Sequence, residues 1–279
     1  MKFKILIENT TKDSLISEHG LSIYIELGDI RILLDSGQSD AFMDNARSMG
    51  IDLKEVDFAV LSHGHYDHSG GFDKFLEKYK DIELYAMKDV DLDLYSGSGD
   101  KIHYIGVSEE LHNKHRDRFK LVDGFKRLRD NVYVVPHNTE GLNEIGKRCK
   151  LYKKSGEGFI PDDFSHELSL VIDTRNGLVV FNSCSHGGVI NIIEEVKERF
   201  PDKRVYAFVG GLHMKGMSDG KEICIYSDEE LKELINYLLD NNVNKLYTGH
   251  CTGAVAYEKL KLIMQDKIEY IYTGREIII

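Results

Sequence analysis

One stretch decides the fold and the chemistry of this chain: Val60-Leu61-Ser62-His63-Gly64-His65-Tyr66-Asp67-His68-Ser69-Gly70-Gly71. The residues from Val56 to Leu61 are apolar or β-favouring with one Asp among them, so a buried strand is expected to lead into this stretch. His63 and His65 stand two positions apart, and on an extended backbone such side chains point to the same side. The three glycines relieve crowding in the turn that follows and allow positive φ.

The side chains of this stretch are of types that bind metal ions. Asp67 and His68 follow His65 after one more residue and can turn toward a second point. Zinc or iron binds imidazole nitrogen and carboxylate oxygen at about 2.0–2.2 Å. One short loop that offers both can hold half the ligands of two neighbouring ions. The alternative is a polar loop with unrelated histidines, which four ligands at this spacing behind a strand disfavour.

These residues resemble the His-x-His-x-Asp-His signature of the metallo-β-lactamase-fold superfamily. Leu33-Leu34-Asp35-Ser36-Gly37 resembles the early Leu-Asp-Thr-Gly segment of that family, and Thr248-Gly249-His250 resembles its late Gly-His. The resemblance spans most of the chain and is weakest from Met87 to Ser165. It implies a mixed α/β (α+β) fold, a four-layer αββα sandwich made of one domain over residues 1–279.

The size and charge of the chain narrow the classes of function. Its 279 residues are 42% hydrophobic, which is enough for a core, and its net charge of −11 argues against a polyanionic partner such as nucleic acid. No signal-peptide core and no long apolar run are seen, so we expect no membrane segment. Four cysteines without a close pairing motif fit a cytoplasmic protein. The expected partner is a small-molecule substrate. Assembly into a homo-oligomer is left open.

Hydrophobic runs and glycine signals predict regular elements on both sides of one poorly patterned segment. Strands are expected at Phe3 to Ile7, Leu21 to Leu27, Ile30 to Leu34, Ile82 to Met87, Leu168 to Asp173, Leu178 to Phe181, Val205 to Val209, Val243 to Tyr247, Ile268 to Tyr272 and Glu276 to Ile279. Helices are expected at Asp40 to Met49, Phe72 to Tyr79, Val189 to Phe200, Ser227 to Leu239 and Ala254 to Met264. From about 88 to 165 the pattern is irregular, with only short strands expected at Ile102 to Val107 and Val132 to Val135. This irregularity favours an inserted lid or specificity segment over a simple decoration.

A hydrophobic strand followed by glycine and histidine recurs at His63, His186, His213 and His250. Loops carried on rigid strands are where a functional site is expected. His213, after Gly210-Gly211, is read as a substrate contact or a substitute metal ligand, with a core histidine as the alternative. The histidines of the irregular segment are expected at the surface: His103, His112, His115 and His137.

The resemblance implies which residues bind metal. His63 and His65 would bind one ion with a later histidine, and Asp67 and His68 would bind a second ion with His250. Two residues compete for the later histidine. His186 follows a strand and opens a helix beside two glycines, whereas His166 precedes a strand as the family motif usually does. We favour His186.

Several positions are expected to support the metals rather than bind them directly. Asp35, at a strand end, is a candidate hydrogen-bond acceptor for a ligand imidazole. Tyr66 is a candidate donor to a developing oxyanion. The family usually has a metal-bridging Asp where this chain has Ser183-Cys184, so either Cys184 lies near the metals or only water bridges them. Histidine at position 65, where the diiron flavoprotein branch has glutamate, fits hydrolysis.

The expected chemistry is hydrolysis by metal-activated hydroxide at a pair of divalent ions, zinc first, with iron or manganese as alternatives. Asp67 would be both ligand and orienter of the nucleophile, and the helix after His186 offers N–H groups that favour anions. Ser183-Cys184-Ser185-His186 and His250-Cys251-Thr252-Gly253 resemble a subgroup generally described as metal-dependent hydrolases.

Three functions follow from this resemblance. The first is a hydrolase of a small, phosphate-bearing ester. The second is a transferase, because the same subgroup includes archaeal proteins assigned to joining a dihydropterin diphosphate to a ribofuranosyl-aminobenzene phosphate. The third is a non-catalytic metal-dependent sensor or binding protein, which a complete ligand set disfavours.

Overall fold

The computed structural model describes residues 1–90, 93–98 and 101–279. The chain divides into two compact units. The first comprises Met1–Phe125, Pro136–Leu168 and Tyr272–Ile279, and the second comprises Lys126–Val135 and Ser169–Ile271. The expectation of a single domain over the whole chain stays a prediction.

The first unit is built on a seven-stranded sheet of order β20-β1-β2-β3-β4-β5-β8. Its strands are β1 (Lys2–Ile7), β2 (Ser22–Leu27), β3 (Ile30–Leu34), β4 (Phe58–Val60), β5 (Glu83–Met87), β8 (Phe119–Val122) and β20 (Glu276–Ile278). The predicted hairpin at Gly28-Asp29 joins β2 to β3, and from β3 to β8 the neighbouring strands are parallel. Parallel neighbours end at the same edge of the sheet, which is where β3 and β4 deliver their loops.

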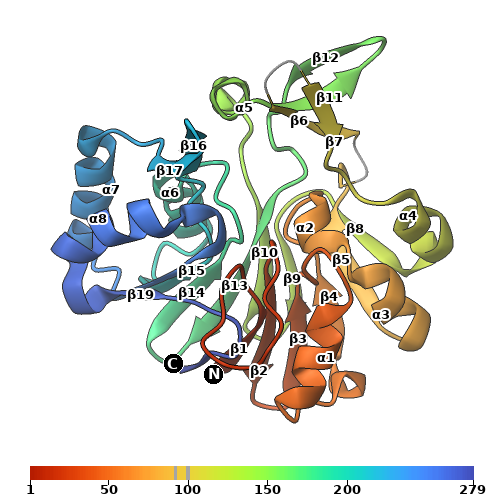
Figure 1. The fold of residues 1–279 in the computed structure, drawn as a ribbon. Coiled ribbons are helices and arrows are strands. Elements are labelled where there is room, and N and C mark those ends of the chain that lie inside the picture. The colour runs from red at the N-terminus through yellow and green to blue at the C-terminus, as the bar shows by residue number, and fades with distance from the viewer. Residues whose placement is uncertain (91–92, 99–100) are drawn as a thin grey trace. The chain divides into compact units, whose positions relative to one another are not determined.

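Helices α1 (Ala41–Ser48) and α3 (Phe72–Lys78) cover one face of this sheet (Figure 1). Phe42 of α1 and Phe75 of α3 are fully buried, with ring centroids 5.8 Å apart. They pack with Leu33 and Ala59 of the sheet in one hydrophobic cluster. The short helix α2 (Tyr66–Ser69) contains the Asp67-His68 pair, and α4 (Glu109–His115) lies beside α3.

The second unit holds another seven-stranded sheet, of order β19-β18-β15-β14-β13-β10-β9. Its strands are β9 (Lys126–Arg129), β10 (Val132–Pro136), β13 (Leu168–Thr174), β14 (Gly177–Phe181), β15 (Val205–Val209), β18 (Lys245–Thr248) and β19 (Ile268–Tyr270). β14, β15, β18 and β19 run parallel to one another, whereas β13 pairs with β14 antiparallel. A hairpin of β16 (Lys215–Ser218) and β17 (Lys221–Cys224), which was not predicted, stands apart from this sheet.

Three helices gather against this second sheet: α6 (Val189–Arg199), α7 (Asp228–Asp240) and α8 (Ala254–Met264) (Figure 1). The apolar residues that the helical spacing picked out in α6, Ile192, Ile193 and Val196 among them, are buried in one cluster with the sheet. A capping box is present at Ser227 and Glu230, with both of its hydrogen bonds formed. These elements confirm the prediction of a mixed α/β chain.

The segment from about 88 to 165 is more regular than predicted. It supplies β8 to the first sheet and β9 and β10 to the second, so it is not a simple insertion. A four-stranded sheet of order β12-β11-β6-β7 and the helix α5 (Leu142–Cys149) make up much of the rest. Its strands are β6 (Leu94–Ser98), β7 (Lys101–Tyr104), β11 (Leu151–Ser155) and β12 (Gly158–Pro161). Positions 91–92 and 99–100 of the segment lie outside the described residues, and its role as a lid stays a prediction.

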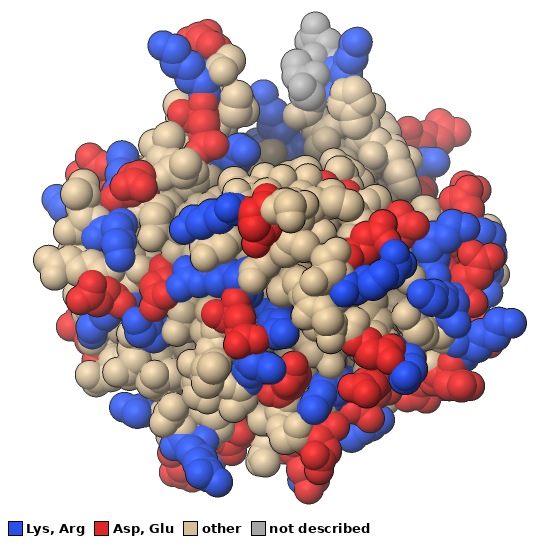
Figure 2. Space-filling model, turned by 60° about the horizontal axis from the view of Figure 1, so that its bottom comes forward, with Lys and Arg blue, Asp and Glu red and all other residues tan. Residues whose placement is uncertain are grey.

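Two surface properties bear on the expected partners. None of the helices among the described residues is long and apolar enough to cross a membrane. On the face shown in Figure 2, lysine and arginine side chains are interspersed with aspartate and glutamate.

Candidate metal centre

In the first unit the candidate site begins where the parallel strands β3 and β4 end. Leu34 pairs with Val60, so Asp35 and the loop after β4 leave the sheet at the same edge. The Asp35 N–H donates to the Val60 carbonyl at 2.9 Å. Asp35 has a φ of 57°, a conformation uncommon for residues other than glycine. Backbone strain of this kind persists where the surroundings hold it in place, often at functional sites.

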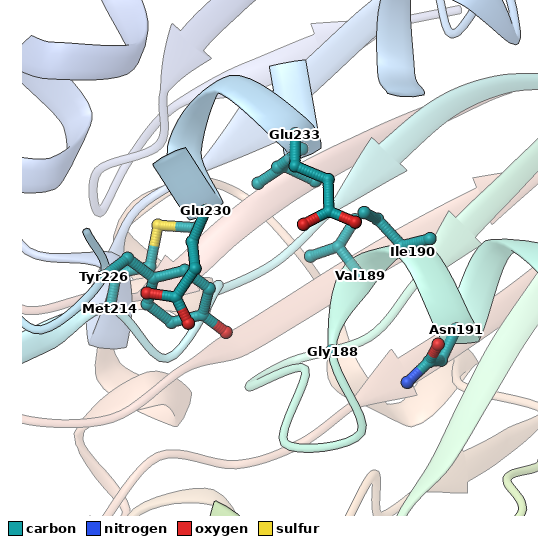
Figure 3. Close-up of a pocket in the computed structure, with 9 residues that line it drawn as sticks. Gly188, Val189, Ile190, Asn191, Met214, Tyr226, Glu230 and Glu233 are labelled. Atoms are coloured by element: carbon teal, nitrogen blue, oxygen red, sulfur yellow. The ribbon is translucent and has the colours of Figure 1, made fainter. Parts of the chain in front are cut away.

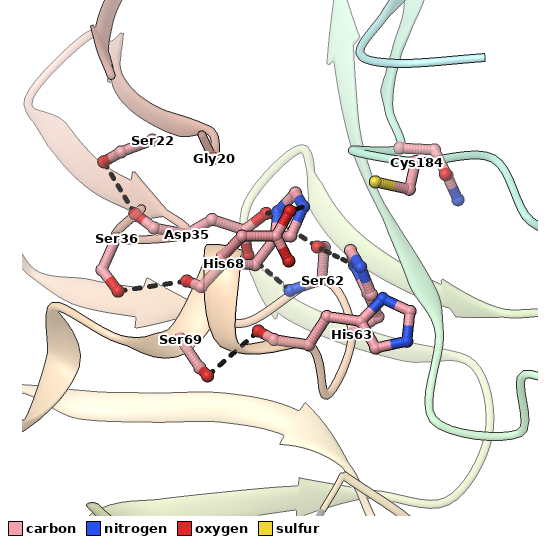
Figure 4. Close-up of polar contacts among 12 residues, drawn as sticks. Gly20, Ser22, Asp35, Ser36, Ser62, His63, His68, Ser69 and Cys184 are labelled. Atoms are coloured by element: carbon pink, nitrogen blue, oxygen red, sulfur yellow. Dashed lines mark hydrogen bonds and ion pairs between the residues drawn. The ribbon is translucent and has the colours of Figure 1, made fainter. Parts of the chain in front are cut away.

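The Asp35 carboxylate is fully buried and accepts three hydrogen bonds (Figure 4). Its Oδ1 accepts from the Ser62 N–H at 2.8 Å. Its Oδ2 accepts from the Ser62 hydroxyl at 2.7 Å and from Nδ1 of His68 at 2.8 Å. The predicted supporting role of Asp35 thus has a matching geometry, and Ser62 is a partner that the sequence reasoning did not single out.

This network assigns the ring tautomers of two candidate ligands. His68 donates its Nδ1 proton to Asp35, which leaves a lone pair on Nε2. The hydroxyl proton of Ser62 is used on Asp35, so the 2.8 Å contact between Ser62 Oγ and His63 Nδ1 has the imidazole as donor. His63 is then also left with an Nε2 lone pair. Both rings are prepared as metal ligands through Nε2.

The candidate ligands of this unit are close together and buried. The ring centroid of His63 lies 4.6 Å from that of His65 and 4.1 Å from that of His68. Oδ2 of Asp67 is 3.6 Å from Nε2 of His68. Two ligand atoms bound to one ion at about 2.1 Å and a tetrahedral angle stand roughly 3.4 Å apart. The donor set and its spacing therefore fit a divalent transition metal.

The glycines of the loop are needed for close approach rather than for positive φ. A Cβ on Gly70 would stand 2.2 Å from the Gln38 carbonyl oxygen, and one on Gly71 would stand 2.4 Å from the Ser39 oxygen. Gly70 and Gly71 have φ of −63° and −79°. The expectation that they adopt positive φ is wrong, because what excludes a side chain here is the neighbouring backbone.

Two further side chains touch or flank Asp67. His19 places Nε2 at 3.2 Å from Asp67 Oδ2, and its side chain is 52% exposed. No spacing pattern links it to the metal loop, so the sequence reasoning missed it. Tyr66 is 40% exposed, and burial of its hydroxyl together with the Asp67 charge raises the pKa of the phenol. Tyr66 thus stays protonated and able to donate, and its role as a donor to an oxyanion stays a prediction.

His166, the competitor for the third ligand position, has both ring nitrogens in use. Its Nδ1 accepts from the Gly64 N–H at 3.1 Å, so Nε2 carries the proton and donates to Asp162 Oδ2 at 3.0 Å. Burial raises the pKa of Asp162, but His166 and then His65 more than offset this, and the pKa lies well below its usual value. His65, Asp162 and His166 also offer ligand atoms within 4.8 Å of one another.

In the second unit the candidate residues follow three neighbouring parallel strands. Ser183 to His186 come after β14, His213 comes after β15, and His250 and Cys251 come after β18. The carboxyl ends of neighbouring parallel strands share one edge, so these loops meet. Ser185, His213 and His250 have φ of 55°, 50° and 51°. Strained backbone therefore recurs at the candidate residues of both units.

Two groupings form at this edge. The rings of His186 and His213 have centroids 4.5 Å apart. Cys184, His250 and Cys251 offer ligand atoms that all lie within 4.8 Å of one another. Burial raises the pKa of the Cys251 thiol, but hydrogen bonds with Cys184 and His213 and the nearby His250 more than offset it, so the pKa lies well below its ordinary value.

The glycine pair after β15 has a packing role. A Cβ on Gly210, whose φ is 139°, would stand 1.9 Å from the Asn182 carbonyl oxygen. A Cβ on Gly211 would stand 2.3 Å from the sulfur of Cys251. These glycines let the loops after β14, β15 and β18 approach one another. Close packing therefore explains why positions 210 and 211 are glycine, and no contact with a substrate anion is needed for that explanation.

A pocket of about 230 Å³ lies beside the first turn of α6. Figure 3 shows the carboxylates of Glu230 and Glu233 among its lining residues, together with Asn191. The anion-binding helix start that was expected after His186 therefore has carboxylates for neighbours. Their negative charge opposes a bound phosphate at this place.

One expectation for the intervening histidines is wrong. His115 is only 9% exposed and its Nε2 lies 3.1 Å from the Asp73 carboxylate, which holds it against α3 rather than at the surface. His103 is exposed, as expected.

The chain is similar to known proteins along its whole length. The pattern of the metallo-β-lactamase superfamily matches residues 17–146. An uncharacterized protein of Methanocaldococcus jannaschii is 30% identical over 280 residues, covering 98% of each chain. The 7,8-dihydropterin-6-methyl-4-(β-D-ribofuranosyl)-aminobenzene-5′-phosphate synthase of the same organism is 28% identical over 93% of this chain and 89% of its own. A crystal structure described as a metal-dependent hydrolase of the β-lactamase superfamily matches with a TM-score of 0.82 and 28% identity, covering 100% of this chain and 99% of its own.

Proposed function

Since the chain belongs to the metallo-β-lactamase superfamily, whose proteins bind divalent metals, we propose that it is a hydrolase of a small ester. The observation that carries the proposal is the Asp35 network, which leaves the Nε2 atoms of His63 and His68 as metal ligands. A buried carboxylate that orients two imidazoles at once is a costly arrangement without a metal to bind. The 5′-phosphate in the name of one relative favours a substrate that bears a phosphate.

The proposed ligands comprise four residues of the loop after β4 and two histidines of the later family motifs. His63, His65, Asp67 and His68 supply the first set, and the family motifs add His186 and His250. For the third histidine, the use of both ring nitrogens of His166 favours His186. The set holds two divalent ions, with zinc as the first candidate because imidazoles outnumber carboxylates.

Each residue near the ions has a distinct task in this proposal. When bound, the ions supply Lewis acidity that polarises a substrate oxygen and acidifies water. Asp67 orients the nucleophile through its carboxylate, whose Oδ2 lies 3.2 Å from Nε2 of His19. The protonated Tyr66 hydroxyl donates a hydrogen bond to the oxygen on which negative charge develops.

The first experiment joins metal analysis to hydrolysis. We expect the purified protein to contain a stoichiometric transition metal and to hydrolyse a generic phosphodiester such as bis(p-nitrophenyl) phosphate. His63→Ala and Asp67→Ala should each lose hydrolysis and one equivalent of metal, while His103→Ala, which alters an exposed histidine of β7, should keep both. Wild-type protein that folds but retains no transition metal after dialysis against zinc would refute the proposal.

A transferase is the second candidate, and the synthase relative is the observation that favours it. In that reaction the bound ions would assist departure of a diphosphate rather than attack by water. Incubation with a dihydropterin diphosphate and ribofuranosyl-aminobenzene phosphate distinguishes the two. Joined product would assign a synthase, and its absence alongside phosphodiester cleavage would assign a hydrolase.

A further inference from the structure

The second unit contains a compact group of two cysteines and one histidine. The proposed mechanism uses only the histidine, His250. The sulfurs of Cys184 and Cys251 and a ring nitrogen of His250 lie within 4.8 Å of one another. Cys184 and His250 are 3% and 2% exposed, and Cys251 is partly exposed. We call these three residues the thiol–imidazole cluster. All four cysteines of the chain lie among the described residues, and none forms a disulfide.

Hydrogen bonds between the three loops hold the cluster in place. The Gly211 N–H donates to the Ser183 carbonyl at 2.8 Å, and the Ser185 hydroxyl donates back to the Gly211 carbonyl at 2.7 Å. The Leu212 N–H donates to the Thr252 hydroxyl at 2.9 Å. Ligands carried on a scaffold that is tied together in this way need little rearrangement to bind an ion.

Two further contacts define the position of the Cys251 sulfur. It lies 3.7 Å from the Cys184 carbonyl oxygen. It also sits where a side chain at Gly211 would be, since a Cβ there would be 2.3 Å away. The site thus has room for a sulfur atom at one defined point, between the loops that carry Cys184 and Gly211.

The donor types and their spacing indicate the kind of ion. In a tetrahedral zinc site with Zn–S of about 2.3 Å, two sulfurs stand roughly 3.8 Å apart. The ligand atoms of the cluster are up to 4.8 Å apart. Rotation of the side chains and a small contraction bring them to the spacing of a zinc site. Thiolate sulfur selects soft ions such as zinc, whereas magnesium and manganese prefer oxygen ligands.

We propose that Cys184, Cys251 and His250 bind one thiophilic divalent ion, so that the metal associated with His250 has sulfur as well as imidazole ligands. The inference deepens the proposed function, since His250 belongs to both, and it names zinc rather than manganese or magnesium as the ion. Three protein ligands leave a fourth position for a further ligand or water.

The test uses the full-length reduced protein loaded with Co²⁺, whose thiolate complexes show an intense sulfur-to-cobalt absorption in the near ultraviolet. We expect the wild-type protein to show this absorption at one equivalent of bound cobalt. Cys184→Ala and Cys251→Ala should each weaken it and lower zinc affinity at least about tenfold. Cys224→Ala, which alters a cysteine of β17, should leave both unchanged.

A second measurement on the wild-type protein covers the case in which a cysteine variant does not fold. Zn²⁺ should protect Cys251, the partly exposed cysteine of the cluster, from iodoacetamide, as located by peptide mass spectrometry, while Cys224 is alkylated equally with and without the ion. Mg²⁺ should give no protection. Cobalt bound without the sulfur absorption, or equal alkylation of Cys251 with and without zinc, would overturn the inference.

The outcomes separate this inference from the proposed function. His63→Ala removes a ligand of the first unit and should abolish hydrolysis while keeping the sulfur-to-cobalt absorption. Stoichiometric metal and hydrolysis without that absorption would sink only the thiol–imidazole cluster. The absorption in a protein that cleaves no phosphodiester would instead leave the cluster standing and sink the hydrolase.

Discussion

Asp35 is a residue whose single carboxylate prepares two imidazoles. It accepts directly from His68 and, through the Ser62 hydroxyl, controls His63. The carboxylate is fully buried, so replacing it leaves donors that water cannot satisfy. Asp35 is therefore expected to affect metal binding through His63 and His68, although it is not itself a proposed ligand.

We predict that Asp35→Asn lowers zinc affinity by about 10–100-fold, since one of the two accepting oxygens becomes an NH2 group, which leaves a donor of Ser62 or His68 without its acceptor. Competition with a chromogenic chelator measures the change. Asp29→Asn, at the exposed turn of the β2–β3 hairpin, is the matched control and should bind zinc as the wild type does. Unchanged affinity in a folded Asp35→Asn protein would show that the network does not prepare the ligands.

The two competing histidines should respond differently to replacement. His166 is fully buried and bonded to Asp162 and Gly64, so His166→Ala should lower the free energy of unfolding by about 2–3 kcal/mol while metal still binds at saturating zinc. His186→Ala should instead lose one equivalent of metal. Elemental analysis and thermal unfolding of both variants check this, and the opposite pattern would make His166 the ligand.

At the scale of single residues, sequence spacing identifies some participants and misses others. His63, His65, Asp67 and His68 were predictable because they follow one strand at fixed spacing. His19 and Asp162 lie far from that loop in the sequence, and neither has a neighbour pattern that marks it. Contacts such as the 3.2 Å approach of His19 to Asp67 depend on tertiary packing, which a local pattern does not encode.

Among the elements, the ends of parallel strands decide where the chemistry lies. Hydrophobic strands followed by glycine and histidine were predictable, and the parallel order of β14, β15 and β18 gives the reason that their loops meet. The role of Gly210 was not predictable, because the Asn182 carbonyl that excludes a side chain there belongs to a different strand end.

We predict that Gly210→Ala destabilises the protein by about 2–3 kcal/mol, because its φ of 139° and the Asn182 oxygen both oppose a Cβ. Chemical denaturation measures the loss. Gly158→Ala in β12 is the control, since its added Cβ would meet only the Ser155 oxygen, at 3.9 Å. Equal stability of the two variants would contradict the packing role assigned to Gly210.

The segment from 88 to 165 shows why some strands escaped prediction. β12 is one of them: three of its four residues are exposed, and no alternation of apolar and polar side chains marks it. β6 pairs with β11 about 55 positions further along, as in the pairing of Tyr95 with Tyr152. Short, exposed strands with distant partners carry little local signal.

For the molecule as a whole, metal binding should be coupled to stability. An ion at about 100 times its dissociation constant stabilises the folded state by about 2.7 kcal/mol, which raises the melting temperature by roughly 5–10 °C. We predict that the melting temperature falls by this amount when a chelator removes the metal and recovers when zinc is added. Calorimetry measures both changes. His63→Ala should show a smaller shift, and an identical shift in that variant would place the stabilising ion elsewhere.

We propose above all that His63, His65, Asp67 and His68, which follow β4, bind a catalytic metal. Anomalous diffraction at the zinc absorption edge, from crystals of the zinc-loaded protein, tests this most directly. We predict anomalous peaks within about 2.0–2.2 Å of Nε2 of His63 and Nε2 of His68. Fully loaded crystals with no peak near either atom would contradict it.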